Sequence, residues 1–130
     1  MKVVMVDDDD IFLMIQSRSV VLGQLCTKPV CINDSAYALA YLLEDMQQIP
    51  PEPYLLLLDI NMPKLNGWQL MDALIAGGAG DRLMVAIVSS SINEADKQKA
   101  STYPQIVSFI EKPMLQTHVA ALKEICSAIS

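Results

Sequence analysis

Five short apolar runs recur along this 130-residue chain, separated by segments in which apolar residues repeat about every 3.6 positions. The runs predict strands at Lys2–Val6, Lys28–Ile32, Tyr54–Leu58, Leu83–Ser89 and Ile106–Ile110. The intervening segments predict helices at about Asp10–Leu25, Ser35–Gln47, Gly67–Ala76 and Asn93–Thr102, followed by a C-terminal helix with the stripe Leu115, Val119, Leu122, Cys126 and Ile129. Strict alternation of this kind predicts an α/β fold, with a parallel sheet covered by helices on both faces.

The composition of the strands predicts their order in the sheet. The first, third and fourth runs are apolar on both faces, as central strands of a parallel sheet are. The second run contains Pro29, which cannot donate to a strand ladder, and the fifth has Ser108 in its middle, so both are expected at edges. The expected architecture is a flavodoxin-like (βα)5 doubly wound parallel sheet with strand order 2-1-3-4-5.

Length and charge limit the range of functions. A chain of 130 residues with 52% apolar residues fits one domain, residues 1–130, with a real core. The formal net charge of −6 disfavours nucleic-acid binding and favours cationic proteins and metal ions as partners. The apolar run that ends at Val6 is too short for a secretory signal or a membrane span, and no later run is long enough, so no membrane association is expected.

Three cysteines, Cys26, Cys31 and Cys126, are an odd number without CxxC spacing. This pattern argues against a disulfide framework and against a zinc site. We expect buried, reduced thiols in a cytosolic protein.

Polar side chains follow four of the five predicted strands, at the edge where a doubly wound sheet holds its site. They are Asp7–Asp10 after the first strand, Asp59 after the third, Ser89–Ser91 after the fourth and Lys112 after the fifth. Crowded carboxylates need a cation, and an oxygen-only set suits Mg²⁺ or Mn²⁺. A hydroxyl and an ammonium beside such a cation could hold the oxygens of a phosphoryl group, which points to phosphoryl transfer onto an aspartate.

Each of these signals has a simpler interpretation when taken alone. The aspartate run could be a solvated loop or a helix N-cap, and the strand-end aspartate and serine could be turn or capping residues. A calcium-binding EF-hand is excluded because its glycine and later glutamate are missing. His118 is expected at the surface, and the apolar residues around Trp68 are expected to pack in the core.

The chain resembles the receiver domain of two-component response regulators over about residues 2–129. The matching motifs are Val-Met-Val-Asp7-Asp8-Asp9, Leu-Leu-Asp59-Ile-Asn-Met-Pro-Lys-Leu-Asn-Gly67, Ile-Val-Ser89-Ser-Ser and Phe109-Ile-Glu-Lys112-Pro113. The resemblance implies that Asp59 is the phosphoacceptor. It also implies that Asp7, Asp8, Asp59 and the backbone carbonyl of Asn61 bind the metal.

Other positions take their roles from the same resemblance. Ser89 and Lys112 would each contact a phosphoryl oxygen, Ser89 and Phe109 would form the switch, and the bond between Lys112 and Pro113 would be cis. Ser89 stands where threonine is also common, which preserves the hydroxyl. Phe109 stands where tyrosine also occurs, so burial alone would have to favour its inward rotamer.

The resemblance implies a cytoplasmic phosphoacceptor that assists its own phosphorylation and dephosphorylation, and not an enzyme. Its partners would be a sensor histidine kinase or a histidine phosphotransfer protein, and a downstream protein target. The chain is expected to act as a stand-alone receiver, although it could also be a fragment of a longer regulator.

Two alternatives remain open. Asp7-Asp8-Asp9 after an apolar strand also fits the Asp-x-Asp motif of haloacid-dehalogenase-type phosphatases, with Asp7 as nucleophile. In that case Asp59 would have no role and the chain would lack room for a cap. The second alternative is a pseudo-receiver that binds a partner without phosphorylation, although its acidic pair and lysine are complete.

Overall fold

The computed structural model describes residues 1–49, 51–90 and 93–129, and its helices and strands alternate along the chain as predicted. The strands are Lys2–Val6 (β1), Val30–Ile32 (β2), Tyr54–Leu58 (β3), Leu83–Ser89 (β4) and Ile106–Glu111 (β5). The α-helices are Asp10–Leu22 (α1), Ser35–Asp45 (α2), Gly67–Ala76 (α3), Glu94–Ala100 (α4) and Gln116–Ile129 (α5), and a short 3₁₀ turn (η1) covers Gly80–Arg82.

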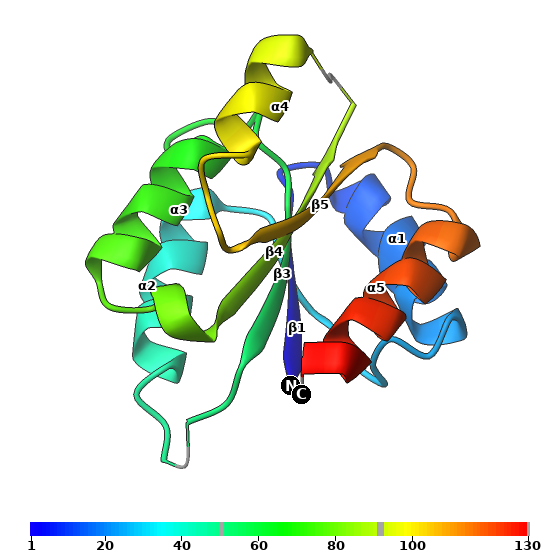
Figure 1. The fold of residues 1–130 in the computed structure, drawn as a ribbon, viewed down its shortest axis with the longest axis horizontal. Helices are drawn as coiled ribbons and strands as arrows, with labels where there is room; N and C mark the ends of the chain where they lie inside the picture. Colours follow the sequence, from blue (N-terminus) through cyan, green and yellow to red (C-terminus); the bar gives the residue numbers. More distant parts are fainter. Residues whose placement is uncertain (50, 91–92, 130) are drawn as a thin grey trace.

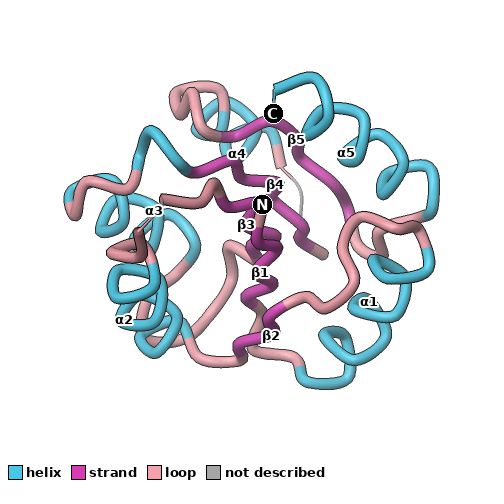
Figure 2. Tube along the Cα trace, turned by 90° about the horizontal axis from the view of Figure 1, so that it is seen from below, coloured by secondary structure: helices cyan, strands magenta, loops and turns pink. Residues whose placement is uncertain are grey.

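The strands form one parallel sheet in the order β2-β1-β3-β4-β5, which confirms the predicted flavodoxin-like fold. Helices α1 and α5 cover one face of the sheet, and α2, α3 and α4 cover the other (Figure 1). Seen along the strands, the sheet lies between these two groups of helices (Figure 2). Every residue of β3 is buried, as the apolar composition of this run predicts for a central strand.

Each face of the sheet has its own apolar core. On the α1 and α5 side, Val3 and Met5 of β1 pack with Leu13, Val20 and other buried residues. On the opposite side, Val4 and Val6 pack with residues of α2 and α3, including Trp68. The side chains of β1 therefore alternate between the two cores, and packing from both sides fixes the register of the strand.

Strand β5 contains a bulge. Val85 of β4 pairs with Ile106, but the next residue, Ala86, pairs with Ser108, so Val107 is an extra residue in β5. Val107 packs against the core on the α1 and α5 side, which is also the side of Ala86. Such an extra residue reverses the side-chain alternation beyond it.

Several predicted boundaries differ from the structure. Helix α2 ends at Asp45 and not at Gln47, α4 covers Glu94–Ala100 and not Asn93–Thr102, and β5 extends to Glu111. Helix α1 ends at Leu22 and not at Leu25, because Gly23 forms its C-cap and Gln24 takes a positive φ of 61°. Strand β2 starts at Val30 and omits Lys28 and Pro29, which is consistent with the missing N–H of proline. Helix α5 begins at Gln116, so Leu115 precedes it and is 56% exposed.

Several other expectations have clear outcomes. Trp68, Leu70, Met71 and Leu74 are buried in the core, as expected. Gly77 is the C-cap of α3, and Gly78 follows it with a φ of +90°, which glycine adopts without a Cβ clash. Ser91 and the side chain of Ile129 lie outside the described residues.

The cysteine prediction is correct for one residue only. Cys126 is buried, whereas Cys26 is half-buried and Cys31 is exposed because it lies on the three-residue edge strand β2. None of the helices within the described residues is long and apolar enough to cross a membrane.

Candidate functional site

Three carboxylates meet at the carboxyl edge of the sheet. Val6 pairs with Leu58 in the β1–β3 ladder, so the residues that follow them, Asp7 and Asp59, leave the sheet side by side. Asp8 joins them, and one carboxylate oxygen from each of the three residues lies within 4.8 Å of the other two. Asp7 and Asp59 are buried, and Asp8 is exposed. The structure thus brings together the acidic residues that the sequence predicted to be close.

The chain between β1 and α1 holds the acidic residues in place. Asp9 is the N-cap of α1, and its Oδ1 accepts hydrogen bonds from the N–H groups of Ile11 at 3.0 Å and Phe12 at 3.1 Å. The N–H of Asp9 donates to Oδ1 of Asp7 at 2.9 Å. Asp10 accepts a hydrogen bond from the side chain of Asn33. Two of the four consecutive aspartates therefore stabilise the local fold, and the other two belong to the acidic site.

Lys112 reaches this acidic site from the end of β5. Its Nζ lies 2.6 Å from Oδ2 of Asp7 and 3.6 Å from Oδ2 of Asp59. The ring of Phe12 lies below the ammonium, with 4.3 Å between Nζ and the ring centroid. The peptide bond between Lys112 and Pro113 is cis. The ammonium is thus held between two carboxylates and an aromatic face, all of which favour its charged form.

The charges of the site influence one another. Burial raises the pKa of Asp59, and the nearby charge of Asp7 raises it further, against the N–H of Asn61 and the ammonium of Lys112, which lower it. Burial alone would lower the pKa of Lys112, but its hydrogen bond to Asp7 and the charge of Asp59 outweigh that effect and raise it. Lys112 therefore stays charged, while the ionised form of Asp59 is disfavoured.

Ser89 and Asn61 lie next to Asp59. Ser89 is fully buried at the end of β4, and its Oγ accepts a hydrogen bond of 3.4 Å from the side-chain amide of Asn61. The N–H of Asn61 donates to Oδ1 of Asp59 at 3.2 Å. Asn61 thus connects the serine hydroxyl to the central carboxylate through two hydrogen bonds.

Phe109 lies on the same face of the sheet as helix α4. It pairs with Ile87 in the β4–β5 ladder, is half-buried and packs against the core on the side of α2, α3 and α4. The bulge at Val107 puts it there, because regular alternation from Ile106 would turn it toward α5.

The donor set fits a hard divalent cation. Carboxylates of Asp7, Asp8 and Asp59 offer oxygens, which Mg²⁺ and Mn²⁺ prefer. Burial and mutual repulsion already disfavour the ionised form of Asp59, so a bound cation would relieve an unfavourable charge. Lys112 partly neutralises two of these carboxylates, those of Asp7 and Asp59, through its ion pairs.

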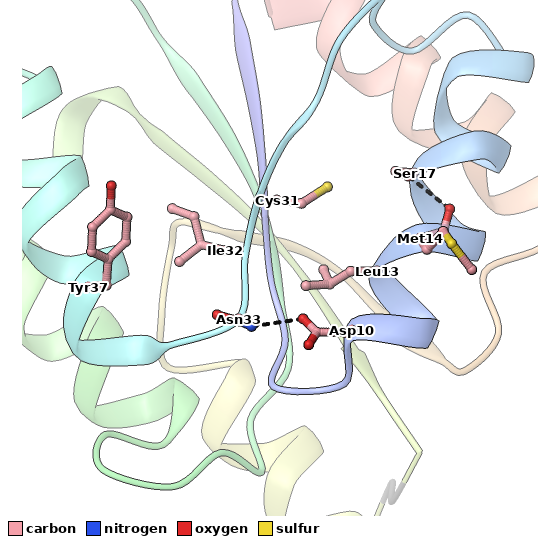
Figure 3. Close-up of a pocket in the computed structure, with 8 residues that line it drawn as sticks. All are labelled: Asp10, Leu13, Met14, Ser17, Cys31, Ile32, Asn33 and Tyr37. Atoms are coloured by element: carbon pink, nitrogen blue, oxygen red, sulfur yellow. Dashed lines mark hydrogen bonds between the residues drawn. The ribbon is translucent and has the colours of Figure 1, made fainter.

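A separate groove lies beside this site, between α1 and α2 and over the edge strand β2 (Figure 3). It has a volume of about 400 Å³ and is lined by residues that include Asp10, Met14, Cys31, Asn33 and Tyr37. It contains none of the residues predicted to carry phosphoryl chemistry. The candidate site is therefore the acidic cluster at the sheet edge and not this groove.

Two contacts of the site had no signal in a sequence motif. Phe12 reads as an ordinary apolar residue of α1, yet its ring lies against Lys112. The side chain of Asn61 contacts Ser89, whereas the family resemblance implied a role for its backbone carbonyl alone. His118 is half-buried and accepts a hydrogen bond from the N–H of Leu115 through Nδ1, which is a local contact at the start of α5.

Comparison with known proteins gives a consistent result. A profile of the response regulator receiver domain matches residues 3–123, whereas a search of curated proteins gave no significant match. A two-component response regulator from Cytophaga hutchinsonii has a TM-score of 0.87 and 22% identity, with 98% of this chain and 96% of that chain covered. A response regulator receiver protein from Dyadobacter fermentans has a TM-score of 0.82 and 22% identity over the same shares of the two chains.

A third solved structure is that of the phosphorylated cyanobacterial phytochrome response regulator RcpA. It has a TM-score of 0.76 and 23% identity, with 99% of this chain and 95% of that chain covered. At such identities the three likenesses show a shared fold, and the profile match over most of the chain shows the family. This chain belongs to the response regulator receiver domain family.

Proposed function

We propose that this chain is a phosphoacceptor of a two-component system, in which Asp59 accepts a phosphoryl group from a histidine kinase or a histidine phosphotransfer protein. The observation that carries the proposal is the position of Asp59 beside the Asp7–Asp8 pair and within 3.6 Å of the Lys112 ammonium. Phosphoryl transfer to an aspartate needs a nucleophilic carboxylate, acidic residues that bind a metal ion, and a positively charged side chain held in place. Asp59, the Asp7–Asp8 pair and Lys112 would supply these three groups.

In the proposed reaction, an oxygen of the Asp59 carboxylate attacks the phosphorus of a phosphohistidine. The new O–P bond forms as the P–N bond breaks, and the electron pair of that bond leaves with the imidazole. Lys112 and the Ser89 hydroxyl would each contact a non-bridging oxygen and stabilise its charge. Mg²⁺ or Mn²⁺, when bound by Asp7, Asp8, Asp59 and the backbone carbonyl of Asn61, would neutralise charge on the phosphoryl oxygens.

We further propose that Ser89 and Phe109 act as the switch. A phosphoryl group on Asp59 would draw the Ser89 hydroxyl away from Asn61, and Phe109, which is now half-buried, would move further into the space on the α4 side. The outer surface of α4, β5 and α5 would then change, which is a population shift between two packings. A downstream protein would recognise the changed surface.

The proposed setting is the bacterial cytoplasm. Its reducing conditions would keep the three cysteines of the chain as thiols. The kinase and phosphotransfer partners that we propose act in the same compartment, so no transport step separates donor and acceptor.

Intact-mass measurement tests the phosphoacceptor. After incubation with acetyl phosphate and Mg²⁺, the protein should gain the mass of one phosphoryl group, and the modified peptide should contain Asp59. Asp59→Asn should gain none, because an amide is a far poorer nucleophile than a carboxylate. Asp10→Asn is a matched control outside the site and should be modified as the wild type is.

Other outcomes would identify the alternatives. Modification of Asp7, or turnover of a small phosphate ester that survives Asp59→Asn, would indicate a phosphatase of the haloacid dehalogenase type. No modification of the wild type by acetyl phosphate or by any histidine kinase would indicate a pseudo-receiver.

Lys112→Ala tests the switch. This variant should still take up some phosphoryl group but transmit it poorly, because the ammonium would no longer connect the phosphoryl group to β5. Amide chemical shifts of α4 and β5 should therefore move less on phosphorylation than in the wild type. Equal shifts in the two proteins would contradict the coupling role of Lys112.

A further inference from the structure

Gln16 is a polar residue in an otherwise apolar position. It lies on the buried face of α1 between Leu13 and Val20 and is 2% exposed. Its side-chain amide makes two hydrogen bonds to the backbone of Met114: Nε2 donates to the carbonyl at 3.2 Å, and Oε1 accepts from the N–H at 2.9 Å. A buried amide that satisfies both backbone groups of one residue fixes that residue relative to the helix.

Met114 lies two residues after Lys112, in the loop between β5 and α5. At the other end of this short segment, the N–H of Lys112 donates to the carbonyl of Ser89 at 2.9 Å. The segment is thus anchored at its start by β4 and at its end by Gln16 of α1. The Lys112 side chain projects between these two anchors into the acidic site, where it meets Asp7 and Asp59.

The same helix carries other parts of the site. Phe12, one turn before Gln16, lies under the Lys112 ammonium, and the N-cap residue Asp9 holds Oδ1 of Asp7. Helix α1 therefore helps to fix the positions of both the Asp7 carboxylate and the Lys112 ammonium that pairs with it. Gln16 connects the helix to the backbone of residues 112–115, the lysine loop between β5 and α5.

The space beneath this loop is nearly filled. A cavity of about 10 Å³, which is at the lower limit for holding one water molecule, is lined by Asp7, Asp59, Gln16, Met114 and apolar residues of α1 and the sheet. Loss of the Gln16 amide without loss of its volume would free the loop to shift, whereas a small replacement would also enlarge this cavity. Methionine, which is unbranched and of similar size, is the appropriate substitution.

We propose that Gln16 is a positioning residue: by fixing the backbone of Met114, it holds the Lys112 ammonium within contact of Asp7 and Asp59. The inference deepens the proposed phosphoacceptor function and rests on it for its biological meaning. The position of Lys112 itself can be measured without any phosphoryl donor, so the two proposals can fail separately.

The deciding experiment is NMR of the metal-free protein with labelled lysine, comparing wild type, Gln16→Met and the control Gln116→Met. Gln116, the first residue of α5, also joins α1 through one amide hydrogen bond, from Nε2 to the carbonyl of Ser19 at 2.9 Å, and Ser19 lies about one turn farther from the start of α1 than Gln16 does. In the wild type and in Gln116→Met, the side chain of Lys112 should show a nuclear Overhauser effect to the ring of Phe12. In Gln16→Met this effect should weaken or vanish, and the Lys112 side-chain shifts should change.

Phosphoryl uptake from acetyl phosphate supplies the second readout. Gln16→Met should slow it by about tenfold, since a small misplacement of a reacting group can cost up to about a hundredfold. Gln116→Met should match the wild type. In a Lys112→Ala background, Gln16→Met should add no further loss, because the group that it positions is already absent.

Contradicting results are distinct for the two proposals. An unchanged Lys112 signal in Gln16→Met, or an equal loss of uptake with and without Lys112, would show that Gln16 only stabilises the fold. Absence of uptake by the wild type would refute the proposed function and leave the NMR result to decide the role of Gln16. If Gln16→Met does not fold, Gln16→Asn, which is shorter by one methylene, should weaken the same Overhauser effect.

Discussion

At the scale of single residues, the charge of Asp59 works against the stability of the fold. The residue is buried beside Asp7, and burial, together with that neighbouring charge, raises its pKa above the ordinary value in spite of Lys112. A carboxyl whose pKa is raised by folding stabilises the folded state when protonated, below its unfolded pKa, and loses that stabilisation as the pH rises through the folded pKa. At neutral pH the ionised Asp59 is therefore destabilising.

Asp59→Asn should accordingly raise the melting temperature at pH 7 in the presence of EDTA. We expect a gain of a few degrees, since 1 kcal/mol corresponds to about 4 °C in a domain of this size. Thermal unfolding followed by circular dichroism at several pH values measures it. The gain should shrink as the pH falls through the raised folded pKa of Asp59, and it should be smallest below the unfolded pKa of about 3.9. A gain that is constant with pH would mean that the charge of Asp59 is not its cause.

At the scale of secondary-structure elements, a second polar cluster joins three elements at the amino edge of the sheet. Oδ2 of Asp45, at the end of α2, accepts hydrogen bonds from Nζ of Lys2 at 2.9 Å and from the hydroxyl of Tyr54 at 2.5 Å. Burial raises the pKa of Asp45, but these two hydrogen bonds outweigh it and hold the pKa below its usual range. The cluster ties α2 to the first residues of β1 and β3.

Asp45→Asn should destabilise the protein by about 2 kcal/mol at pH 7, because it weakens two hydrogen bonds to a charged acceptor. The stabilisation by Asp45 is present above its unfolded pKa of about 3.9 and is lost as the pH falls through the lower folded pKa. Urea unfolding at pH 7 and at pH 3 should therefore show a smaller difference from wild type in acid.

Tyr54→Phe is the matched control for this cluster. It removes the hydroxyl and leaves the ion pair between Lys2 and Asp45, so a loss of about 1 kcal/mol is expected. The double variant should lose less than the sum of the two single losses, because both changes remove the same hydrogen bond. Additive losses would show that the two residues act independently.

The order of the elements could be predicted from the sequence, and several of their details could not. Alternation of the two side-chain periods identified the elements, and Pro29 together with Ser108 identified the edge strands, because these features are local. The bulge at Val107 depends on how β5 pairs with β4, which no local pattern records. Helix α1 ends at Leu22 with Gly23 as its C-cap, and Leu25 then packs against the core outside the helix, although its spacing from the preceding apolar residues continued the helical pattern.

The same distinction applies to the candidate site. Asp7, Asp59 and Lys112 were predicted to meet because the carboxyl ends of parallel strands share one edge, and the structure places them within ion-pair distance. Gln16 and Phe12 touch the lysine loop from a helix whose rotation about its axis decides which side chains face inward. Polar or aromatic residues within an apolar stripe give no indication of that contact without the tertiary structure.

At the scale of the whole molecule, the acidic cluster lies in a chain that already carries a formal net charge of −6. The general negative field attracts cations weakly, whereas the three clustered carboxylates provide one place where a divalent ion meets several oxygens. Binding at that place would stabilise the folded state, because the unfolded chain has no such cluster.

Millimolar Mg²⁺ should therefore raise the melting temperature above that in EDTA. At a concentration tenfold above the dissociation constant the gain is about 1.4 kcal/mol. Asp8→Asn should abolish the gain, because it removes one of the three clustered carboxylates. Asp8 is exposed, so the change leaves the core intact. NaCl at matched ionic strength controls for general screening, and a gain of equal size with NaCl, or in Asp8→Asn, would contradict a specific site.

The bulge in β5 has a consequence for how chain length can vary in this molecule. Val107 is the residue without a partner in β4, whereas Ser108, Phe109 and Glu111 are paired in regular register. Deleting Val107 would remove its packing, but Ser108 would then follow Ile106 directly and every later residue would keep its partner in β4. Phe109 would still face α4, and Lys112 would still reach Asp59. The bulge thus allows the chain to gain or lose one residue here without changing the pairing of the residues that lead to the acidic site. In homologous chains we expect alignment gaps at this position.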